Sequence, residues 1–468
     1  MIIPFATQTY QHASKPISAQ RAVNCYAEAQ PKDAKTQVAL LGCPGIVTFA
    51  TCGNGPVRGM HVMGGVLYVV SGQRLYSVSS TGTATDIGGN ITGSDVVSMD
   101  DNGTELAIVT GTNGYLYSTT VGFILISDTD FNDANTVTFF DQRFVFDWKG
   151  TNKFFASSLL DGSSYSATAF ASAETRPDNV HAVILNKQVL LVCGTRSIEP
   201  WQNVGAANFP FERIPGAVIE RGLAEPHAIC KEDNTVFFMG DDRVFYRLDG
   251  LTPVRVSTHA LEHTWQSHST LDQLFCFSYP WEGHKFVVVT FPATNTTYEL
   301  DIATGFWHER ESWDINNRSL GRWRGNCHVA VYDYELIGDS FSGKIGYLSH
   351  HTYTEFGNTV QMLATSPSIH SDRKRVFIPR FEMDIEGGVG LESGQGSDPQ
   401  VMLRTSKDGG RTWGASQKCR SMGAVGAYQT RMRWLNLGQA REWVFEVTIS
   451  DPVKRNVISA HADLMVGI

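Results

Sequence analysis

Two histidines and a glutamate at close spacing are the first candidates for metal chemistry. His259, Glu262 and His263 match the H-x-x-E-H pattern of inverted zinc proteases. On a helix, residues four positions apart share a face, so both imidazoles are able to reach one ion. The pattern also needs a third ligand and a long supporting helix, and the flanking sequence is strand-like. We therefore interpret these residues as a polar surface turn and predict no metal site.

Residues 211–215 offer a second chemistry, the binding of a carboxylate by arginine. The segment Phe211-Glu212-Arg213-Ile214-Pro215 resembles the F/Y-R-I-P element of sialidases with one residue inserted. The sialidase element stands early in the chain and its arginine acts with two others, whereas Arg213 lies in mid-chain. A Tyr–Glu nucleophile pair and an acid/base Asp cannot be placed. Chance is the better explanation, and we predict no catalytic residue.

A third motif is an Asp box, which occurs several times in sialidase propellers and once here. The segment from Ser406 to Trp413 matches S-x-D-x-G-x-T-W. Its physical content is a hairpin turn, in which a carboxylate accepts backbone N–H groups, a glycine adopts a positive φ and a tryptophan packs beneath. We therefore predict a structural turn without a catalytic group, made by Ser406, Asp408, Gly410, Thr412 and Trp413.

The remaining motifs bind no cofactor in our interpretation. The glycine-rich segment 53–59 contains Pro56 and precedes no helix, which indicates a turn before a strand rather than a phosphate loop. No Ser–His–Asp or Cys–His grouping can be defended, so the sequence predicts no enzyme and no cofactor. The basic run Arg373, Lys374 and Arg375 is either a solvated linker or a docking patch for an acidic neighbour.

Short strands paired around a Gly or Asp turn are the elements that must position these motifs. Val66–Val70 with Arg74–Val78 is one example, and Val236–Met239 with Val244–Tyr246 is another. A period of about 40 to 50 residues with four short strands per unit is typical of β-propeller blades. We predict six or seven blades over residues 49–360. The turn glycines that mark the period are Gly72, Gly111, Gly150, Gly194 and Gly240.

The last part of the chain has a different pattern. Strand-like runs such as Val376–Ile385 and Trp443–Ile449 flank a glycine-rich loop, which predicts an antiparallel β-sandwich over residues 361–468. Residues 1–48 stand apart and either close the propeller or reach a neighbouring chain. Helical pattern is scarce, and the best helix candidate is 258–266 with Thr258 as N-cap. The fold class is therefore all-β, a propeller followed by a sandwich.

Charge separates the two predicted domains. The 468-residue chain has a formal net charge of −9. Residues 361–468 hold 14 basic and 11 acidic residues, a net of +3, so the remainder carries −12. Phosphate binding needs clustered Lys and Arg, which excludes a nucleic-acid clamp as the main activity of the chain.

The cysteines and the N-terminus indicate the compartment. The eight cysteines include no C-x-x-C pair, and most lie among strand-like residues, which favours free buried thiols in a reducing compartment. Met1-Ile2-Ile3-Pro4-Phe5 lacks the basic flank and long apolar run of a signal peptide. No apolar stretch approaches the roughly 18 residues that span a bilayer. We expect a soluble protein made in a cytoplasm.

An ordered series of short motifs runs along the chain. These are Asn24-Cys25-Tyr26, Gly42-Cys43-Pro44-Gly45-Ile46, Gly55-Pro56-Val57-Arg58-Gly59-Met60, the hairpin with Gly72, Leu75 and Tyr76, Arg176-Pro177-Asp178, and Ser197-Ile198-Glu199-Pro200-Trp201 with Gln202 to Gly205. In this order the motifs resemble those of a known family, the packaged-DNA stabilisation proteins of short-tailed bacteriophages, also called tail accessory or nozzle proteins. The resemblance covers most of the chain, is strongest over residues 20–260, and depends on the order of the motifs.

The resemblance implies a structural protein of the virion tail, assembled in the host cytoplasm. Family members form a hexameric tube below the portal and its adaptor ring, retain the packaged DNA and form the conduit for its ejection. They also contact the tail needle or plug and help to seat tailspikes or tail fibres. An acidic propeller suits such a conduit, because counterion release cannot favour adhesion of DNA to a like-charged wall.

Two rival functions remain open at this point. One is a sialidase-like or glycan-binding propeller, supported by the single Asp box and by Arg213. The other is a receptor-binding tail component whose propeller recognises a cell-surface sugar. Neither rival has an identifiable catalytic constellation in the sequence.

Overall fold

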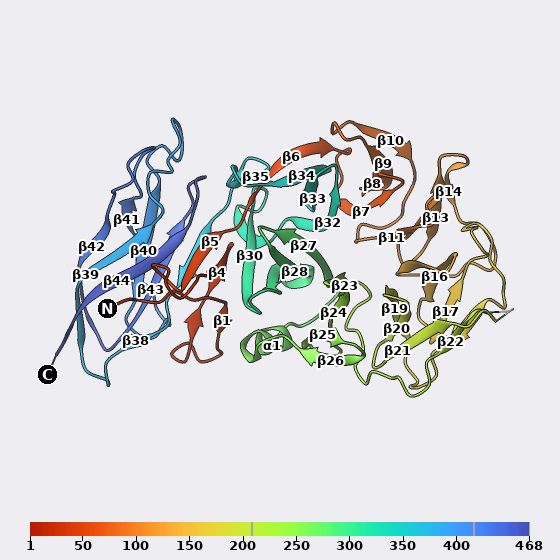
Figure 1. Cartoon of the computed structure of the whole chain (residues 1–468), viewed down its shortest axis with the longest axis horizontal. Helices are drawn as coiled ribbons and strands as arrows, with labels where there is room; N and C mark the ends of the chain where they lie inside the picture. Colours follow the sequence, from red (N-terminus) through yellow and green to blue (C-terminus); the bar gives the residue numbers. More distant parts are fainter. Residues whose placement is uncertain (207–208, 415–416, 468) are drawn as a thin grey trace.

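The computed structural model describes residues 1–206, 209–414 and 417–467. A propeller and a sandwich lie side by side along the long axis, the propeller on the right of Figure 1 and the sandwich on the left. The predicted order of an all-β propeller and a C-terminal sandwich is confirmed. In the described residues the one α-helix is α1 (His259–Gln266), and no helix is long and apolar enough to cross a membrane.

The propeller has seven blades, within the predicted six or seven. Blades 1 to 5 are separate four-stranded antiparallel sheets, and blades 6 and 7 belong to larger sheets. Blades 1 to 6 each fold from four consecutive strands, joined mostly by short turns and in blade 3 by the longer loop 157–169. Blades 1 to 3 are β7 (Val57–Met63), β8 (Val66–Ser71), β9 (Arg74–Val78), β10 (Ala84–Gly88); β11 (Ser98–Asp101), β12 (Glu105–Val109), β13 (Gly114–Ser118), β14 (Gly122–Leu125); and β15 (Val137–Phe140), β16 (Arg143–Trp148), β17 (Lys153–Ala156), β18 (Phe170–Ser172).

Blades 4 to 6 follow the same up-and-down order, and α1 stands between the last two of them. Their strands are β19 (Val180–Asn186), β20 (Val189–Gly194), β21 (Ile198–Asn203), β22 (Phe211–Arg213); β23 (Ile229–Glu232), β24 (Thr235–Met239), β25 (Phe245–Asp249), β26 (Thr252–Arg255); and β27 (Phe275–Trp281), β28 (His284–Phe291), β29 (Thr296–Asp301), β30 (Trp307–Asp314). A 3-10 turn, η1 (Pro292–Thr294), follows β28, and β31 (Ser319–Arg322) extends β30 as a hairpin.

The seventh blade is completed by the N-terminal part of the chain. It contains β32 (Gly325–Val331), β33 (Tyr334–Asp339) and β34 (Lys344–Ser349), and its fourth strand is β6 (Gly45–Thr51), antiparallel to β34. β6 also pairs with β35 (Thr354–Glu355), which forms a hairpin with β36 (Asn358–Thr359). The chain thereby closes its own ring, which leaves no open gap between the last blade and the first.

The sandwich consists of two antiparallel sheets. One contains β37 (Met362–Thr365), β40 (Gln400–Ser406), β41 (Lys418–Ser421) and β43 (Glu442–Ile449), with β38 (Ile369–His370) beside β43. The other contains β39 (Val376–Ile385), β42 (Met432–Ala440) and β44 (Val457–Val466). Phe381, Trp434, Trp443 and Phe445 are buried between them.

The first 51 residues join the two domains. β3 (Ala22–Val23) lies between β30 of blade 6 and β37 of the sandwich, so that one hydrogen-bonded sheet runs through both domains. β4 (Cys25–Ala29) and β5 (Val38–Gly42) add a hairpin to the edge of β44. At the start of the chain, β1 (Tyr10–Gln11) pairs with β2 (Ala19–Gln20).

Candidate functional site

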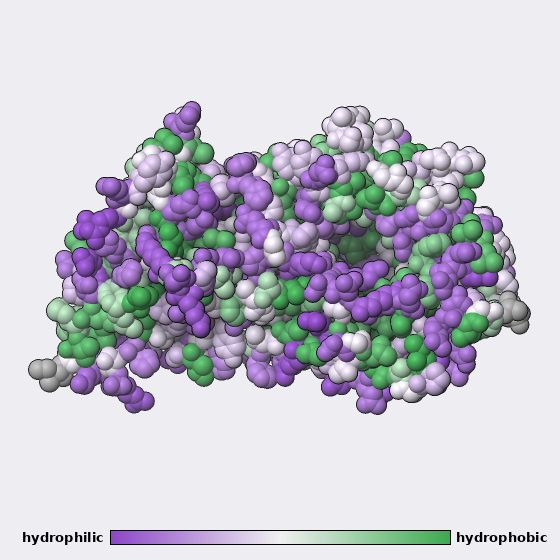
Figure 2. Space-filling model, in the orientation of Figure 1, coloured by the Kyte–Doolittle hydropathy of each residue, from purple (hydrophilic) through white to green (hydrophobic). Residues whose placement is uncertain are grey.

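A narrow axial channel is the main cavity of the propeller. The first strands of the blades touch one another around the ring and line a cavity of about 410 Å³. Its walls include His61, Asp100, Thr138, His227 and Lys231. Figure 2 shows a hollow among the blades, with apolar residues in its depth and polar residues around its mouth. The volume is that of a small-molecule pocket.

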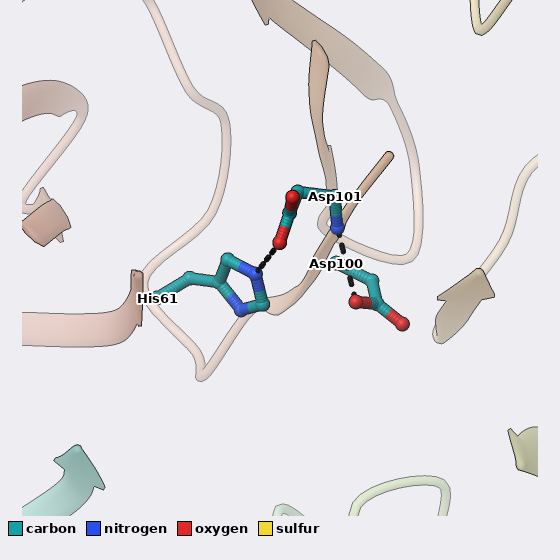
Figure 3. A group of neighbouring side chains, drawn as sticks. All are labelled: His61, Asp100 and Asp101. Atoms are coloured by element: carbon teal, nitrogen blue, oxygen red, sulfur yellow. Dashed lines mark hydrogen bonds and ion pairs between the residues drawn. The ribbon is translucent and has the colours of Figure 1, made fainter. Parts of the chain in front are cut away.

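Three titratable side chains of blades 1 and 2 lie together at this channel. The imidazole of His61 on β7 bonds the carboxylate of Asp101 on β11, with Nε2 and Oδ2 2.6 Å apart (Figure 3). Asp100 accepts backbone N–H groups from Phe139 at 2.7 Å and from Asp101 at 3.0 Å. Their ligand atoms lie within 4.8 Å of one another, the spacing of a cation site. Because these atoms already bond one another or the backbone, the cluster ties neighbouring blades together.

Arg58, which lines the channel, and Gln273 fix the crossovers between blades by hydrogen bonds. Arg58 is buried and donates hydrogen bonds to the backbone oxygens of Gly72, Ile91, Thr92 and Asp95, which fixes the crossover from blade 1 to blade 2. The amide of Gln273, before blade 6, reaches the carboxylate of Asp95 at 2.6 Å. This contact joins the crossover from blade 5 to blade 6 with the crossover from blade 1 to blade 2. Asp95 is exposed and precedes Val96, which lines the channel.

The Asp-box residues form a tight turn after β40. The carboxylate of Asp408 accepts hydrogen bonds from the backbone N–H of Arg411 at 3.0 Å and of Thr412 at 2.9 Å, and from the hydroxyls of Ser406 and Thr412. Burial opposes ionisation, but these hydrogen bonds lower the pKa of Asp408 to about 2. Gly410 has a φ of +89°. The carboxylate of Asp408 thus accepts its hydrogen bonds from residues of its own turn, and these bonds stabilise the turn.

Trp413 belongs to the same turn. The guanidinium of Arg404 on β40 lies 5.0 Å from the centre of its indole ring, and Arg404 also pairs with Glu446 of β43. The tryptophan is therefore held by a cation–π contact at the edge of the sheet.

The basic run Arg373, Lys374 and Arg375 forms the turn between β38 and β39. All three side chains are exposed, and Arg373 has a φ of +63°. The backbone N–H of Lys374 bonds the carbonyl of Ser371 at 2.7 Å. Because β38 pairs with β43 and β39 pairs with β42 and β44, the run is an exposed turn that joins the two sheets of the sandwich, and not a linker between domains.

The H-x-x-E-H residues lie on α1, where His259 is 3.6 Å from Glu262 and Arg255 contacts both of them. Glu262 is buried and pairs with Arg255 and with the hydroxyl of Ser257, whereas the side chain of His259 is 80% exposed. The predicted helix is confirmed, and the interpretation of these residues as a surface turn was wrong. Thr258 occupies the N-cap without a side-chain hydrogen bond. The ion pair of Glu262 holds the first turn of the helix against the end of blade 5.

Arg213 lies on β22, the outermost strand of blade 4. Its guanidinium donates a hydrogen bond to the hydroxyl of Thr175 and lies 4.0 Å from the buried carboxylate of Glu199. The structure thus places Arg213 at the rim of the propeller, away from the axial channel, and does not bring it to the Asp box or to α1.

A cluster of buried charges near the domain junction is absent from the sequence predictions. Arg310 lies between Glu299 at 3.6 Å and Glu355 at 3.7 Å, and all three side chains are almost fully buried. Burial raises the pKa of Glu299, and Arg310 with the hydroxyl of Tyr279 acts against that rise. Next to it, Arg324 makes a two-point contact with Asp339 at 2.9 and 2.7 Å.

The sandwich contributes Arg455 to the same region. Its side chain is fully buried and donates to the carbonyl of Val360 at 2.6 Å, while burial lowers its pKa to about 10. One signal in the sequence could have indicated this cluster. Glu299 on β29 and Arg310 on β30 are charged residues at inward strand positions between aromatic neighbours. The arrangement fixes the two domains as one unit.

Comparisons with known proteins place the chain in a family. No curated protein sequence matches it. Among solved structures, the extracellular domain of the hybrid two-component system BT4673 from B. thetaiotaomicron aligns with a TM-score of 0.44 and 11% identity, over 74% of this chain and 45% of that one. The type-IX secretion component PorZ of Porphyromonas gingivalis aligns with 0.34 and 12%, over 69% and 44%. The chain thus spans less than half the length of either protein.

The N-terminal domain of Nup159 aligns with a TM-score of 0.38 and 9% identity, over 71% of this chain and all of that one. The family comparison is far more extensive. Residues 1–353 match the β-propeller of bacteriophage P22 Gp10, and residues 361–465 match the β-sandwich of the same protein. Because these two matches cover nearly the whole chain in the observed domain order, the chain belongs to the bacteriophage P22 Gp10 family of phage DNA-stabilisation proteins.

Proposed function

We propose that the protein is a non-enzymatic component of the tail nozzle, which closes the packaged head, retains the DNA and forms the conduit for its ejection. The observation that carries the proposal is the match of both domains, in order, to a phage structural protein. A role as a structural stabilisation protein of the phage particle follows from the family. The nozzle and ejection roles go beyond it.

The size of the axial channel determines how such a conduit must be built. A cavity of about 410 Å³ has the volume of a sphere about 9 Å across, which is less than the width of the major groove of B-DNA alone, about 12 Å. DNA therefore cannot pass through the axis of one propeller. The lumen must lie between several copies of the chain, and the proposed assembly is a homo-oligomer, a hexamer in the family pattern.

The charge of the propeller suits a wall that DNA passes without adhering. Residues 1–360 carry a net charge of −12, so phosphates gain no counterion release from contact with them. Many of these carboxylates have a local task as well. Asp128, for example, accepts the backbone N–H of Tyr165 at 3.0 Å, and Asp147 is fully buried. The repulsion of DNA therefore comes from the net charge of the whole domain and does not depend on a row of carboxylates without local partners.

The proposed partners follow from this position in the particle. They are the portal-adaptor ring on the head side, a tail needle or plug at the distal end, and tailspikes or tail fibres on the outside. Packaged DNA passes without sequence-specific binding, and the protein joins the particle in the host cytoplasm. The sialidase-like alternative gains no support from the site, because Arg213 is held at the blade rim by Thr175.

Particles packaged without the protein provide the direct test. We expect such heads to lose their DNA to added nuclease, and purified protein added before the nuclease to restore protection. Negative-stain images should show rings of the protein below portal–adaptor complexes. Heads that keep their DNA without the protein, or a protein that stays monomeric with portal–adaptor complexes present, contradict the proposal.

A further inference from the structure

The two ends of the molecule differ in charge and both expose apolar side chains. At the sandwich end, β39, β42 and β44 form a three-stranded face toward solvent (left in Figure 1). We name as the outer sheet face the side chains that point outward from these strands. They include Phe377, Arg380, Glu382, Asp384, Arg433, Leu435, His461, Asp463 and Met465, and Asp384 is paired with Lys35.

The outer sheet face is apolar in part and basic in part. Leu435 is 60% exposed and Met465 57% exposed, although neighbouring Trp434 and Phe381 are fully buried. Arg380 pairs with Asp463 at 3.1 Å and thereby neutralises it. Glu382 lies opposite Arg433 in the strand register and already pairs with Arg431, so these two arginines share one carboxylate and leave a positive excess. The exposed basic run 373–375 immediately precedes β39. The face is therefore an apolar patch with a positive rim.

The opposite end of the long axis carries the complementary surface. Residues 98–172, which form blades 2 and 3, hold nine acidic and three basic residues. The loop 157–169 between β17 and β18, which we name the blade-3 loop, exposes Leu159 by 58% and Leu160 by 57%. Asp161 follows directly, and the exposed Asp141 is next to Gln142, whose carbonyl accepts the N–H of Leu160 at 2.8 Å.

The backbone conformation of Leu160 and the hydrogen bonds of its loop keep this side chain exposed. Its φ is +54°, a left-handed conformation that is rare for a bulky residue without a compensating function. Carboxylates hold the loop in place, since Glu105 accepts the N–H of Gly162 at 2.9 Å and Asp130 that of Ala167 at 2.9 Å. Hydrogen bonds to Glu105 and Asp130 thus keep Leu159 and Leu160 at the surface of the loop.

We propose that the outer sheet face of one copy binds the blade-3 loop of the next copy, so that the protomers join head to tail. This rests on the proposed oligomer and specifies its interface. Each surface has an apolar centre and a charged rim, and the two rims have opposite signs, which gives both attraction and a fixed orientation. If two copies instead met through the same surface, related by two-fold symmetry, the like charges of the two rims would face each other and repel. A head-to-tail contact forms a closed ring when the rotation that relates one copy to the next adds up to a full turn, and a conduit requires such a ring.

Two single substitutions on different surfaces test the pairing. Leu435→Asp breaks the outer sheet face, and Leu160→Asp breaks the blade-3 loop. Asp tolerates a positive φ better than Leu, so the Leu160→Asp monomer should stay folded. We expect each variant to raise the protein concentration at half-assembly at least about tenfold, as loss of a central apolar anchor does. Arg433→Glu provides a second variant of the outer sheet face that changes charge alone.

Mixing gives the decisive readout. A head-to-tail contact predicts that Leu435→Asp and Leu160→Asp chains, each monomeric alone, form a one-to-one heterodimer and no ring, because one intact pair of surfaces remains. Ile315→Asp, at a side chain 66% exposed on blade 6 and outside both surfaces, is the matched control and should assemble like the wild type. Mass photometry and negative staining, with and without portal–adaptor complexes, measure each state.

The outcomes separate this inference from the proposed function. Wild-type rings that persist in both variants overturn the interface but leave the nozzle role intact. A wild type that forms no ring in any of these conditions overturns both. If Arg433→Glu instead abolishes binding of a random DNA duplex and leaves the rings intact, the outer sheet face binds nucleic acid and the interface is again overturned.

Discussion

Blades 2 and 3 and the junction around blades 6 and 7 are stabilised in different ways. Within residues 98–172, all of which the structure describes, no Lys or Arg pairs with a carboxylate. Their core is aromatic, with Phe131 packed edge-on against Phe146, Phe155 and Tyr165 at 5.1 to 5.6 Å. The junction instead buries several charges and takes strands from three parts of the chain.

The difference shows where the molecule needs a fixed geometry. Apolar packing in blades 2 and 3 is local, because each blade contacts only its neighbours. Buried ion pairs with two-point geometry tolerate little displacement, and removing one partner leaves an uncompensated charge. The junction therefore specifies the angle between propeller and sandwich, while the far blades remain available as contact surfaces. The following predictions test this contrast, from the largest expected effect to the smallest.

Deletion of residues 1–23 should separate the two domains. It removes β3, which bonds both β30 and β37, and the contacts of Met1 and Ile3 with β44. Burial of Ile3, Val23 and their neighbours contributes about 5 kcal/mol or more to stability, at about 1.5–3 kcal/mol for each large side chain. We expect the calorimetric unfolding peak to split into two and move to lower temperature. One peak at an unchanged temperature would show that the N-terminal strands do not couple the domains.

Arg324→Ala should cost about 3–5 kcal/mol, because it leaves the carboxylate of Asp339 buried without its partner. The matched control at the far end is Arg143→Ala, where the guanidinium donates only to the carbonyl of Ser157 and the loss should be about 1 kcal/mol. Urea unfolding of both variants measures the difference. Equal losses would contradict the contrast between the regions.

The junction should also respond to pH through His284. Its imidazole bonds Asp301 of blade 6 at 2.9 Å and Glu28 of β4 at 2.6 Å. Burial acts against protonation, but these carboxylates raise the pKa of His284 above its ordinary value. A raised folded-state pKa means that the stabilisation is complete below about pH 6.5 and is lost as the pH rises through the folded-state pKa.

His284→Gln should therefore cost about 2 kcal/mol at pH 6 and clearly less at pH 8. Unfolding free energies measured across this range give the result. A loss that is constant with pH would show that the imidazole acts by packing alone.

The sequence was sufficient to predict the blades because their signal is local. Gly72, Gly111 and Gly150 mark the turn between the second and third strands of blades 1 to 3, and each has a positive φ that glycine adopts freely. The strands beside them are apolar and buried. The outer strands, such as Gly122–Leu125, are exposed on one side and carry a weaker pattern, which is why the predicted number of blades was uncertain by one.

The junction could not be predicted because its contacts are distant in sequence. Asn24 donates hydrogen bonds to the carbonyls of Glu311 and Gln361, and Gly42 lies against Arg455. No local period indicates such pairs. The Asp box was recognisable since its residues span only eight positions and bond one another. The sequence also indicated the basic run 373–375, but only the fold places it beside the apolar outer sheet face.

Asp408→Ala should have a small effect confined to the sandwich. The side chain closes a turn at the surface, and comparable capping residues contribute about 1 kcal/mol. Because the folded-state pKa of about 2 lies below the ordinary value, the stabilisation is present above about pH 4 and is lost as the pH falls through 2. Asp408→Asn keeps part of the hydrogen bonding and should lose less. Thermal unfolding at pH 7 and pH 3 checks both, and a larger loss at pH 3 would reverse the assigned sign.

Arg213→Ala should change almost nothing, and this makes it a sharp test of the enzymatic alternative. The side chain is 43% exposed, and its 4.0 Å contact with Glu199 is at the limit of an ion pair, while Glu199 also accepts the backbone N–H of Thr175. Loss of such a partly exposed pair usually changes stability by less than about 0.5–1 kcal/mol. A carboxylate-binding arginine of a sialidase-like site behaves differently, because its loss abolishes turnover while the fold persists. We expect neither the wild type nor the variant to release the fluorophore from a fluorogenic sialoside. Turnover by the wild type that disappears in Arg213→Ala would place chemistry at a blade rim to which we assign none.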